Sequence, residues 1–518
     1  MEILKIVRFQ MCVGEDVGLN MNKRILLVNS PNYDSDDKRR LRPLGISYLA
    51  ASLRNHGFEC DILDPNCHLE ILSVENILDE ICGKEYAVVG ISAVTPNFHH
   101  AVELAEKIKS ETHSMIILGG VHATFSHDKV IDKYNCFDVV MRGEGEHAIV
   151  ELMNDFFTNE KFTYPVSGCT YLNLDGKKHY AQDINSLDTI ENLPLPAQDN
   201  CMEYSETLVN GKVLKNISII TSRGCPYDCM FCSVTSLRRR WITRTPEDIA
   251  NEVLSFYKQN KDIFIVFSDD NFYIDKVRAC SIIDEIYKVC GDTIPFCFAT
   301  RTDLIVRHGI DTLLYLQKNG CYSIELGVEN GDDNVLKRMG KRNNAKNNIE
   351  AIKLIQSSGI NVGIDFILFD PWTTVNEIKQ NIIFLKKSGL WGYFPALIYV
   401  RMLPYPGTKL SSIMNVEYNR FEKLEGYFLN DEIKYLFDMV IKFKNKYQRT
   451  IDIILNNLKT SNAMKDILSL KLLPYLFLEK AVLECEKLSP SFEKIAAEID
   501  ADRIISQIKK KYDINDFS

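Results

Sequence analysis

Three cysteines in the segment 221–234 have the residue type and spacing of metal ligands. Cys225, Cys229 and Cys232 form the pattern C-x3-C-x2-C. A [4Fe–4S] cluster takes four thiolate ligands, so three cysteines leave one iron open to an outside ligand. A structural zinc site is the alternative, but zinc needs a fourth ligand, usually from a second Cys or His pair, and no such pair follows. The spacing therefore predicts an iron–sulfur cluster whose open iron is a reaction site.

This triad, with Phe231 directly before its last cysteine, resembles the radical S-adenosylmethionine (SAM) enzymes. In that family the open iron chelates the amino and carboxylate groups of SAM. An electron from the cluster then cleaves SAM to methionine and a 5′-deoxyadenosyl radical. The resemblance implies a flavodoxin- or ferredoxin-type electron donor, and it implies that Phe231 lies beside the adenine.

Composition limits the other classes of function. The 518 residues are enough for about two to four domains. The net charge of -9 comes from 61 basic and 70 acidic residues without a long block of either sign, which gives no indication of nucleic-acid binding. The fifteen cysteines are scattered through apolar stretches, which favours reduced thiols in a cytoplasmic protein. No apolar run reaches the roughly 18 residues of a membrane span, and residues 1–20 form an extension without the plan of a signal peptide.

Residues 21–160 predict a doubly wound, Rossmann-like α/β domain with a parallel sheet. Short apolar runs alternate there with stretches of 3.6-residue periodicity, such as Ile46–Arg54 and Phe98–Ser110. The expected strands are Ile25–Asn29, Cys60–Leu63, Ala87–Ser92, Met115–Leu118 and Val139–Arg142. Such sheets bind ligands at the carboxyl ends of their strands.

A hairpin and linker, residues 161–215, separate this domain from a second βα series at 216–428. The hairpin is expected over Tyr171–Tyr180 with a turn at Asp175-Gly176, and Leu193–Ala197 reads as extended chain. Thr245 and Pro246 have the types of an N-cap and a first helical residue. The expected strands are Ile217–Thr221, Ile263–Phe267, Pro295–Thr300, Ser323–Gly327, Asn361–Leu368 and Phe394–Arg401.

Six βα units predict a partial (β/α)6 TIM barrel, as in radical SAM enzymes. Catalytic loops of a barrel follow the carboxyl ends of its strands, and the cysteine loop directly follows the first strand. Residues 429–518 predict an α-helical domain, with apolar positions at helical spacing in Ile433–Phe443 and Tyr475–Cys485. We expect it to pack on the barrel or to act as a lid, and we assign it no catalytic residue.

Four loops of the amino-terminal domain are placed to hold a second ligand. They follow strands at one edge of the sheet, and their glycines let a ligand approach the backbone while hydroxyl and amide groups hold a polar tail. Together with Leu41–Leu49, they resemble the cobalamin-binding domain fused to one class of radical SAM proteins. By that resemblance the cobalamin-binding candidates are Pro31, Arg42, Ser92, Thr95, Asn97, Gly119, Gly120, His122, Thr124, Gly143, Glu144 and Gly145.

The alternative for these loops is a nucleotide-binding or ligand-free α/β domain, although no G-x-G-x-x-G opens a helix after the first strand. The D-x-H-x-x-G pattern that supplies a lower cobalt ligand in other cobalamin proteins is also absent, and His68 and His122 lack its spacing. We infer that the base tail enters the pocket and that cobalt has no protein histidine below it. Such weak axial ligation would favour methyl transfer to a radical. Arg42 and Asn97 are candidates for the lower face, with a helix-start or turn role as the alternative.

In the barrel, the resemblance suggests several residues for binding SAM. Asp269 and Asp270 follow the second strand and could accept hydrogen bonds from the SAM amino group, unless one of them caps a helix. Arg301 could pair with the SAM carboxylate, with a surface salt bridge as the alternative. Glu329, in the phrase Gly327–Lys341, is implied to lie near the ribose or amino group of SAM; a surface acid is the alternative.

Two aromatic residues are candidates for substrate contact. Trp372 belongs to Asp370–Val375, where relatives more commonly have a Gly-Pro-Gly-Glu-Thr-like turn, and Tyr405 belongs to Arg401–Thr408. Tyr405 could instead close the barrel. The substrate, a small molecule or a peptide, cannot be read from these residues.

The sequence thus predicts a cobalamin-dependent radical SAM enzyme of the methyltransferase-like class. The expected cofactors are a [4Fe–4S] cluster, SAM and cobalamin, and the expected reaction is methylation of an unactivated carbon through methylcobalamin. A rearrangement or cyclisation with the same cofactors is the alternative. A non-catalytic cobalamin- or redox-responsive binding protein is a more remote one.

Overall fold

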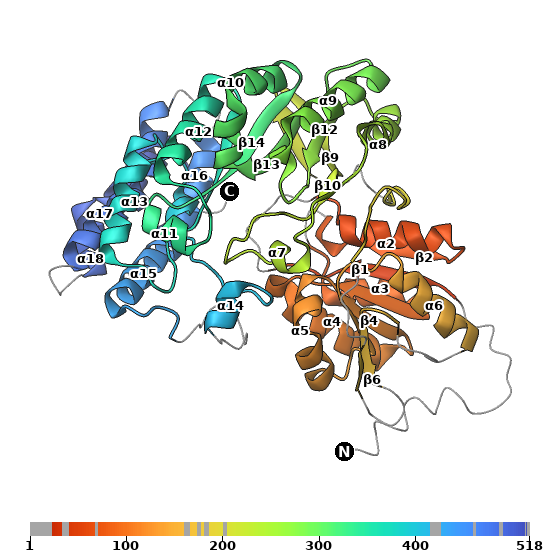
Figure 1. Cartoon of the computed structure of the whole chain (residues 1–518). Coiled ribbons are helices and arrows are strands. Elements are labelled where there is room, and N and C mark those ends of the chain that lie inside the picture. Colours follow the sequence, from red (N-terminus) through yellow and green to blue (C-terminus); the bar gives the residue numbers. More distant parts are fainter. Residues whose placement is uncertain are drawn as a thin grey trace.

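The computed structural model describes residues 23–33, 41–67, 71–159, 166–172, 178–180, 186–199, 205–414, 426–458, 463–485, 491–512 and 514. The predicted extension 1–20, the hairpin turn at Asp175-Gly176 and His68 lie outside these residues. Two sheets organise the chain, one in each half of the molecule (Figure 1). Among the described helices, none combines the length and the apolar character of a membrane span.

The first sheet is the doubly wound sheet that the sequence predicts. Its strands, in spatial order, are β2 (Cys60–Leu63), β1 (Ile25–Asn29), β3 (Val88–Ser92), β4 (Met115–Gly119), β5 (Val139–Met141), β6 (Cys169–Leu172) and β7 (Lys178–Tyr180). β1 to β5 are parallel, whereas β6 and β7 add an antiparallel hairpin to the edge. The hairpin that we expected in the linker is therefore part of this sheet.

Helices cover both faces of this sheet because alternate strand residues point to opposite sides. Leu26 and Val28 pack toward one side, while Ile25 and Leu27 pack toward the other. The first side is covered by α3 (Val74–Cys82), α4 (Phe98–Glu111) and α5 (Val121–Lys133). The second is covered by α2 (Leu44–Asn55) and α6 (Ala148–Asn159).

The second sheet is an open half-barrel. Its strands, in spatial order, are β15 (Asn361–Phe366), β14 (Cys321–Glu329), β13 (Phe296–Arg301), β12 (Ile263–Phe267), β9 (Lys212–Ile219) and β8 (Glu206–Val209). All but β8 run parallel. The larger outer helices are α8 (Pro246–Gln259), α9 (Lys276–Cys290), α10 (Thr302–Lys318), α12 (Ala345–Ser357) and α13 (Val375–Lys387). As expected, Thr245 caps α8 through the Asp248 amide, and Pro246 opens the helix.

The predicted sixth strand, Phe394–Arg401, is wrong. Pro395–Ile398 forms a 3-10 helix, and only Arg401 pairs with the sheet, in a single bridge to Phe369. The Leu397 amide donates to the Phe394 carbonyl, which closes the turn. A short buried apolar run satisfies a strand and a helical turn equally, because periodicity cannot separate them.

Shorter elements surround the carboxyl end of the half-barrel. They are β10 (Ser222–Arg223), α7 (Val234–Leu237), β11 (Ile242–Thr243), α11 (Asp333–Arg338) and α14 (Lys409–Met414), with a 3-10 helix at Phe272–Ile274. Two further 3-10 helices, Pro65–Cys67 and Thr95–Asn97, follow β2 and β3 of the first sheet. β10 and β11 pair as a two-stranded ribbon at the ends of the cysteine loop. The cysteine loop lies between β10 and α7.

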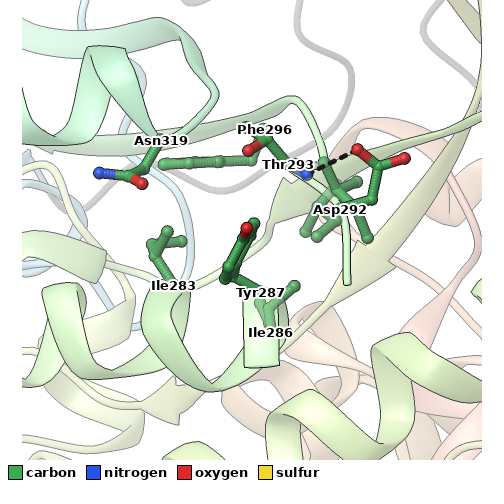
Figure 2. Close-up of a pocket in the computed structure, with 9 residues that line it drawn as sticks. Ile283, Ile286, Tyr287, Asp292, Thr293, Phe296 and Asn319 are labelled. Carbon is green, nitrogen blue, oxygen red and sulfur yellow. Dashed lines mark hydrogen bonds between the residues drawn. The ribbon is translucent and has the colours of Figure 1, made fainter. Parts of the chain in front are cut away.

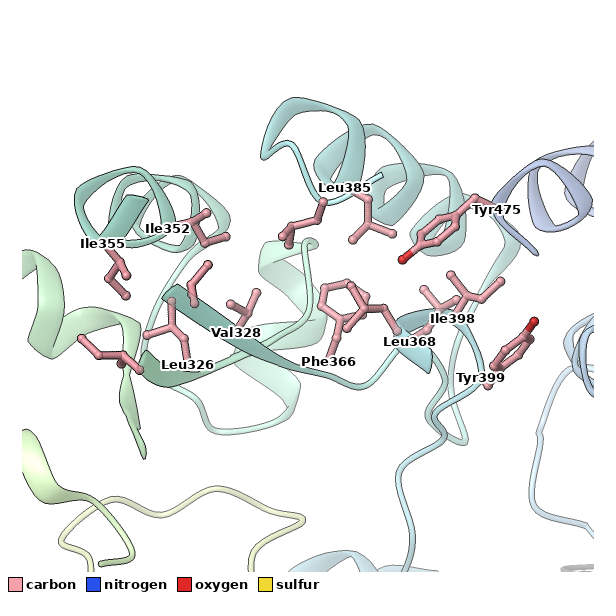
Figure 3. Close-up of a cluster of buried hydrophobic side chains, with 14 of the residues drawn as sticks. Leu326, Val328, Ile352, Ile355, Phe366, Leu368, Leu385, Ile398, Tyr399 and Tyr475 are labelled. Carbon is pink, nitrogen blue, oxygen red and sulfur yellow. The ribbon is translucent and has the colours of Figure 1, made fainter. Parts of the chain in front are cut away.

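The carboxyl-terminal region is helical and packs on the barrel, as predicted. It consists of α15 (Asp431–Phe443), a π-helix (Lys444–Gln448), α16 (Arg449–Leu458), α17 (Met464–Cys485), α18 (Phe492–Glu498) and α19 (Ala501–Tyr512). Figure 3 shows the shared core, where Phe366 and Leu368 lie near Leu385 of α13 and Tyr475 of α17. This burial supplies the hydrophobic stabilisation that fixes the helices on the half-barrel.

A buried ionic cluster joins the two halves of the molecule. Glu252 of α8 lies 3.5 Å from the Arg42 guanidinium and 2.5 Å from that of Arg244. The three side chains are at most 3% exposed. Arg42 also donates to the carbonyls of Ala197 and Ser218, so one guanidinium binds the linker and the barrel.

We expect Glu252→Gln to destabilise the protein by about 3 kcal/mol, because removing one partner of a buried ion pair leaves uncompensated charge. A lower urea midpoint of unfolding would measure this loss. Glu247→Gln, at an exposed position of the same helix, is the matched control and should change stability by less than about 0.5 kcal/mol. Equal midpoints for the two variants would contradict the assigned role of the cluster.

Candidate functional site

The base of the cysteine loop is fixed by two carboxylates from the end of β12. Asp269 accepts hydrogen bonds from the Thr221 amide at 2.6 Å and from the hydroxyls of Thr221 and Ser222. Asp270 accepts from the Gly224 amide at 2.9 Å. Burial raises the pKa of both carboxyl groups. Their contact with the SAM amino group stays a prediction, while the structure gives both a role in shaping the loop.

The three thiols lie close together within this loop. Cys229 is buried, and Cys225 and Cys232 are partly exposed. Burial, together with the charges of the other two thiols, raises the pKa of Cys232 to about 11. Nowhere in the described residues do three His, Cys, Asp or Glu side chains converge on a single ion. A cubane binds each thiolate through a different iron, so its ligands surround a volume rather than one point, and these thiols fit it.

Arg301 lies directly at the cysteine triad. Its guanidinium donates to the Cys229 Sγ at 3.6 Å and to the Asp303 carboxylate at 2.8 Å. It also donates to the Lys341 carbonyl, and it stacks over the Tyr227 ring. A cation beside a thiolate stabilises its charge. The expected pairing with the SAM carboxylate stays a prediction, and sequence reasoning missed the contact with Cys229.

A cavity of about 430 Å³ opens beside the loop and brings together Phe231 and Glu329. Its other lining residues are Ile364, Asp365, Phe366, Ile367, Phe394, Leu397 and Val400. Glu329 is buried, and its carboxylate accepts from Lys341 Nζ at 2.6 Å. The cavity therefore combines apolar walls with a carboxylate held by a cation, which suits a ligand with both a ring and hydroxyl groups.

Neither Trp372 nor Tyr405 lines this cavity. Trp372 packs in one apolar cluster with Phe231 and Ile367. Tyr405 is partly buried, and burial raises the pKa of its hydroxyl. Their contact with substrate stays a prediction.

A second cavity, of about 10 Å³, lies near the amino-terminal end of β13 (Figure 2). It is lined by Tyr287, Thr293 and Asn319, among others, and the Asp292 carboxylate accepts from the Thr293 amide beside it. This volume holds about one water molecule. It has no bearing on the chemistry of the cysteine loop.

In the amino-terminal domain, the predicted cobalamin loops meet at one edge of the sheet. The loops after β1 and β3 are joined because Asn97 donates to the Ser30 carbonyl at 3.0 Å. Ser92, at the end of β3, accepts from the Ser30 amide, beside the buried Pro31. Thr95 lies 3.2 Å from Nδ1 of His122, at the start of α5.

The same edge continues to the loops after β4 and β5. Thr124 accepts from the Gly143 amide at 3.0 Å and donates to the Gly120 carbonyl. Gly120 has φ +97°, and a side chain there would collide with the Ala93 carbonyl. Gly119 faces open space, so a ligand can approach the backbone there, as a cobalamin site requires. A side chain at Gly145 would require the side chains of Met141 and Leu49 to shift.

Glu144 and Arg42 point toward the barrel. Glu144 Oε1 accepts from Arg223 at 2.9 Å, and its Oε2 accepts from Arg238. Arg223 precedes the cysteine loop, and the Arg238 carbonyl accepts from the Cys225 amide. Their predicted contacts with cobalamin stay predictions, and the side chains in the structure bind the radical SAM half. No sequence signal marked Arg223 or Arg238.

The comparisons agree with this architecture. The family model described as "B12 binding domain" matches residues 38–153, and "Radical SAM superfamily" matches residues 219–385. The chain belongs to the B12-binding radical SAM family. It is therefore a cobalamin-dependent radical SAM enzyme whose cofactors are a [4Fe–4S] cluster, SAM and cobalamin.

Two curated relatives of similar sequence are named for different reactions. An uncharacterized methyltransferase of Pyrococcus horikoshii, PH0819, is 28% identical over 75% of this chain and 82% of its own length. The anaerobic magnesium-protoporphyrin IX monomethyl ester cyclase of Cereibacter sphaeroides is 26% identical over 75% of this chain. That match spans 63% of the cyclase, less than two thirds of its length.

A solved structure shares the fold. The cobalamin-dependent SAM radical enzyme OxsB, with aqua-cobalamin and SAM bound, matches with a TM-score of 0.76 and 18% identity. The match covers 95% of this chain and 82% of that one. At this identity the likeness shows a common fold.

Gly224 should be essential to the shape of the cysteine loop. It has φ +88°, and a side chain would collide with the Arg240 carbonyl and the Arg238 side chain. We expect Gly224→Ala to retain less than half of the wild-type iron and sulfide after anaerobic reconstitution. Gly291→Ala is the matched control, since Gly291 has φ +69° but open space around it. Equal iron content in both variants would refute this role.

His122 should make stability depend on pH. Burial lowers its pKa from 6.5 to about 4, so the unfolded chain binds the proton first as pH falls. Above pH 6.5 His122 is neutral in both states, so the free energy of unfolding is at its full value. As the pH falls from about 6.5 to 4, the free energy of unfolding decreases by about 3 kcal/mol. Melting temperatures at pH 7.5 and 4.5 should therefore differ less in His122→Leu than in wild type. His147→Leu, at an exposed position, is the control, and an unchanged difference in His122→Leu would contradict the prediction.

Proposed function

We propose that this chain is a C-methyltransferase that transfers a methyl group to an unactivated carbon of a small molecule or peptide. One observation carries the proposal: the cysteine loop is bound through Arg223 and Arg238 to the loop edge of the B12-binding domain, and Phe231 of the same loop lines the cavity. A substrate carbon near both cofactors could receive the methyl group, because positioning limits such reactions. The similarity to a methyltransferase supports it.

Cys225, Cys229 and Cys232 would hold the cluster. When bound, it supplies the electron that cleaves SAM to methionine and a 5′-deoxyadenosyl radical. Arg301 would stabilise the Cys229 thiolate through its contact of 3.6 Å. Asp269 and Asp270 keep the loop base fixed by accepting from Thr221, Ser222 and Gly224.

The cavity of about 430 Å³ would receive the adenosyl part of SAM. Phe231 and Ile367 supply apolar surface for the adenine and exclude water. Lys341 holds Glu329 in place, so that its carboxylate can accept hydrogen bonds from ribose hydroxyls or from the amino group. Trp372 packs behind Phe231 and would fix its ring.

The amino-terminal loops would hold the polar tail of cobalamin. When bound, cobalamin supplies the methyl group. Gly119 admits the tail, and the hydrogen bonds of Asn97 and Thr124 keep neighbouring loops in register. We infer that His122, among the described residues of these loops, would not hold the cobalt: burial lowers its pKa and keeps it neutral, but its Nδ1 lies 3.2 Å from Thr95 and its ring stacks on Phe98.

A cyclisation or rearrangement with the same cofactors is the second candidate. The 26% identity to a cyclase over three quarters of this chain favours it. In that reaction cobalamin would transfer no methyl group. The two candidates therefore differ in the SAM products that accumulate.

Anaerobic reconstitution with iron, sulfide, cobalamin, SAM and a reductant should distinguish them. With substrate, methylation yields both 5′-deoxyadenosine and S-adenosylhomocysteine, whereas cyclisation yields only the first. The triple variant Cys225→Ala/Cys229→Ala/Cys232→Ala should form neither product yet still bind cobalamin. Cys280→Ala, at a half-buried thiol of α9, is the control and should form both. Failure of the reduced wild type to cleave SAM with any candidate substrate would refute catalysis.

A further inference from the structure

Three cationic side chains lie around the Asp228 carboxylate of the cysteine loop, and a fourth follows one of them in the chain. Arg239 lies 3.0 Å and Lys409 lies 2.5 Å from the Asp228 carboxylate. Both of them, together with Arg342, lower the pKa of Asp228. Arg240 follows Arg239 and pairs with Asp188 at 3.4 Å. The surface thus carries four positive and two negative charges in a chain whose net charge is -9.

These cations are available to a partner. The side chains of Arg239 and Arg240 are 68% and 70% exposed, and that of Lys409 is 49% exposed. Ion pairs at the surface are weak, so the cations can exchange Asp228 or Asp188 for carboxylates of another protein at little cost. The patch therefore fits an acidic surface.

The patch is built on the backbone that holds the cluster ligands. Asp228 directly precedes Cys229. The Met230 carbonyl accepts from Leu410, next to Lys409, and the Met230 amide donates to the Met339 carbonyl, three residues before Arg342. Lys409 opens α14, whereas Arg239 and Arg240 follow α7 and Arg342 follows α11; Figure 1 shows these three helices near one another.

Phe231 of the same loop lines the cavity, whereas Asp228 and the four cations do not. A protein bound at these charges would therefore contact the loop that holds the thiols without entering the cavity. An electron could pass to the cluster through the backbone next to Asp228. The positive charges and their position on the cysteine loop thus both favour an acidic protein that delivers an electron.

We propose that this surface, which we call the Asp228 patch (Asp228, Arg239, Arg240, Arg342 and Lys409), is the docking site of an acidic one-electron carrier protein. The proposal rests on the cluster that the proposed function assigns to the loop. One electron passes from the reduced carrier to the oxidised cluster, so the carrier is oxidised and the cluster is reduced. Attraction between opposite charges would accelerate encounter and orient the carrier.

The test uses reconstituted full-length protein and reduced flavodoxin, an acidic carrier, as the probe. Arg239→Glu/Arg240→Glu should weaken flavodoxin binding at least tenfold at low salt, measured by calorimetry, and should slow cluster reduction in stopped flow to a similar extent. Reduction by dithionite should be unchanged, since this small reductant needs no docking. Wild-type affinity should fall with added salt more steeply than that of the variant.

A matched control carries the same charge change far from the loop. Lys442→Glu/Arg503→Glu replaces two exposed cations of the carboxyl-terminal helices that are also paired with carboxylates. It should bind flavodoxin as wild type does.

Three results would overturn the proposal: equal affinity of the patch variant and wild type, no binding of flavodoxin by wild type, or tighter binding of a short RNA than of flavodoxin. The last would identify the basic residues as a nucleic-acid surface. Failure of the proposed function would look different, because the cluster would then be missing or would not be reduced by dithionite.

Discussion

The arrangement of the two cofactor regions depends on one shared carboxylate. Glu144 lies between Arg223 and Arg238, which flank the cysteine loop at its two ends. Both guanidinium groups are largely buried, so each needs a counter-charge. Glu146 supplies a second partner to Arg223 at 2.7 Å. The loop that presents the cluster ligands is therefore bound directly to the loop after β5, and neither can move without disturbing the other.

This link follows from the geometry of parallel sheets. Ligand-binding loops gather at the carboxyl ends of strands, and each half of the chain contains one such edge. The ionic cluster of Glu252, Arg42 and Arg244 connects the two halves, and Glu144 connects the loop after β5 to the arginines that flank the cysteine loop. Both connections are buried and charged, so another relative orientation of the sheets would leave buried charges without partners. A reaction that needs two cofactors at one carbon benefits from this constraint.

The sequence predicted the strands well and the interdomain contacts poorly, for a physical reason. β1, β2 and β12 have the expected bounds because apolar runs between turn signals report local preference. The strand predicted at Phe394–Arg401 was wrong because a buried 3-10 turn has the same composition as a buried strand. The partners of Arg42 and Glu144 lie up to 210 residues away in sequence, so a single chain gives no signal for them. The cysteine spacing predicted the cluster correctly because its ligands are expected within one loop, and the match to the radical SAM family supports that cofactor. Ligation by Cys225, Cys229 and Cys232 stays a prediction.

The same spacing also explains how one loop can serve two surfaces. The first two cysteines are separated by Pro226, Tyr227 and Asp228. The last of these residues supplies the carboxylate of the Asp228 patch. Met230 and Phe231 separate the last two and join the apolar cluster beside the cavity. The two segments therefore have different neighbours, since the first carries an ion-paired carboxylate and the second carries apolar side chains. Ligation of the cluster by the three cysteines would keep both segments next to the same iron centre.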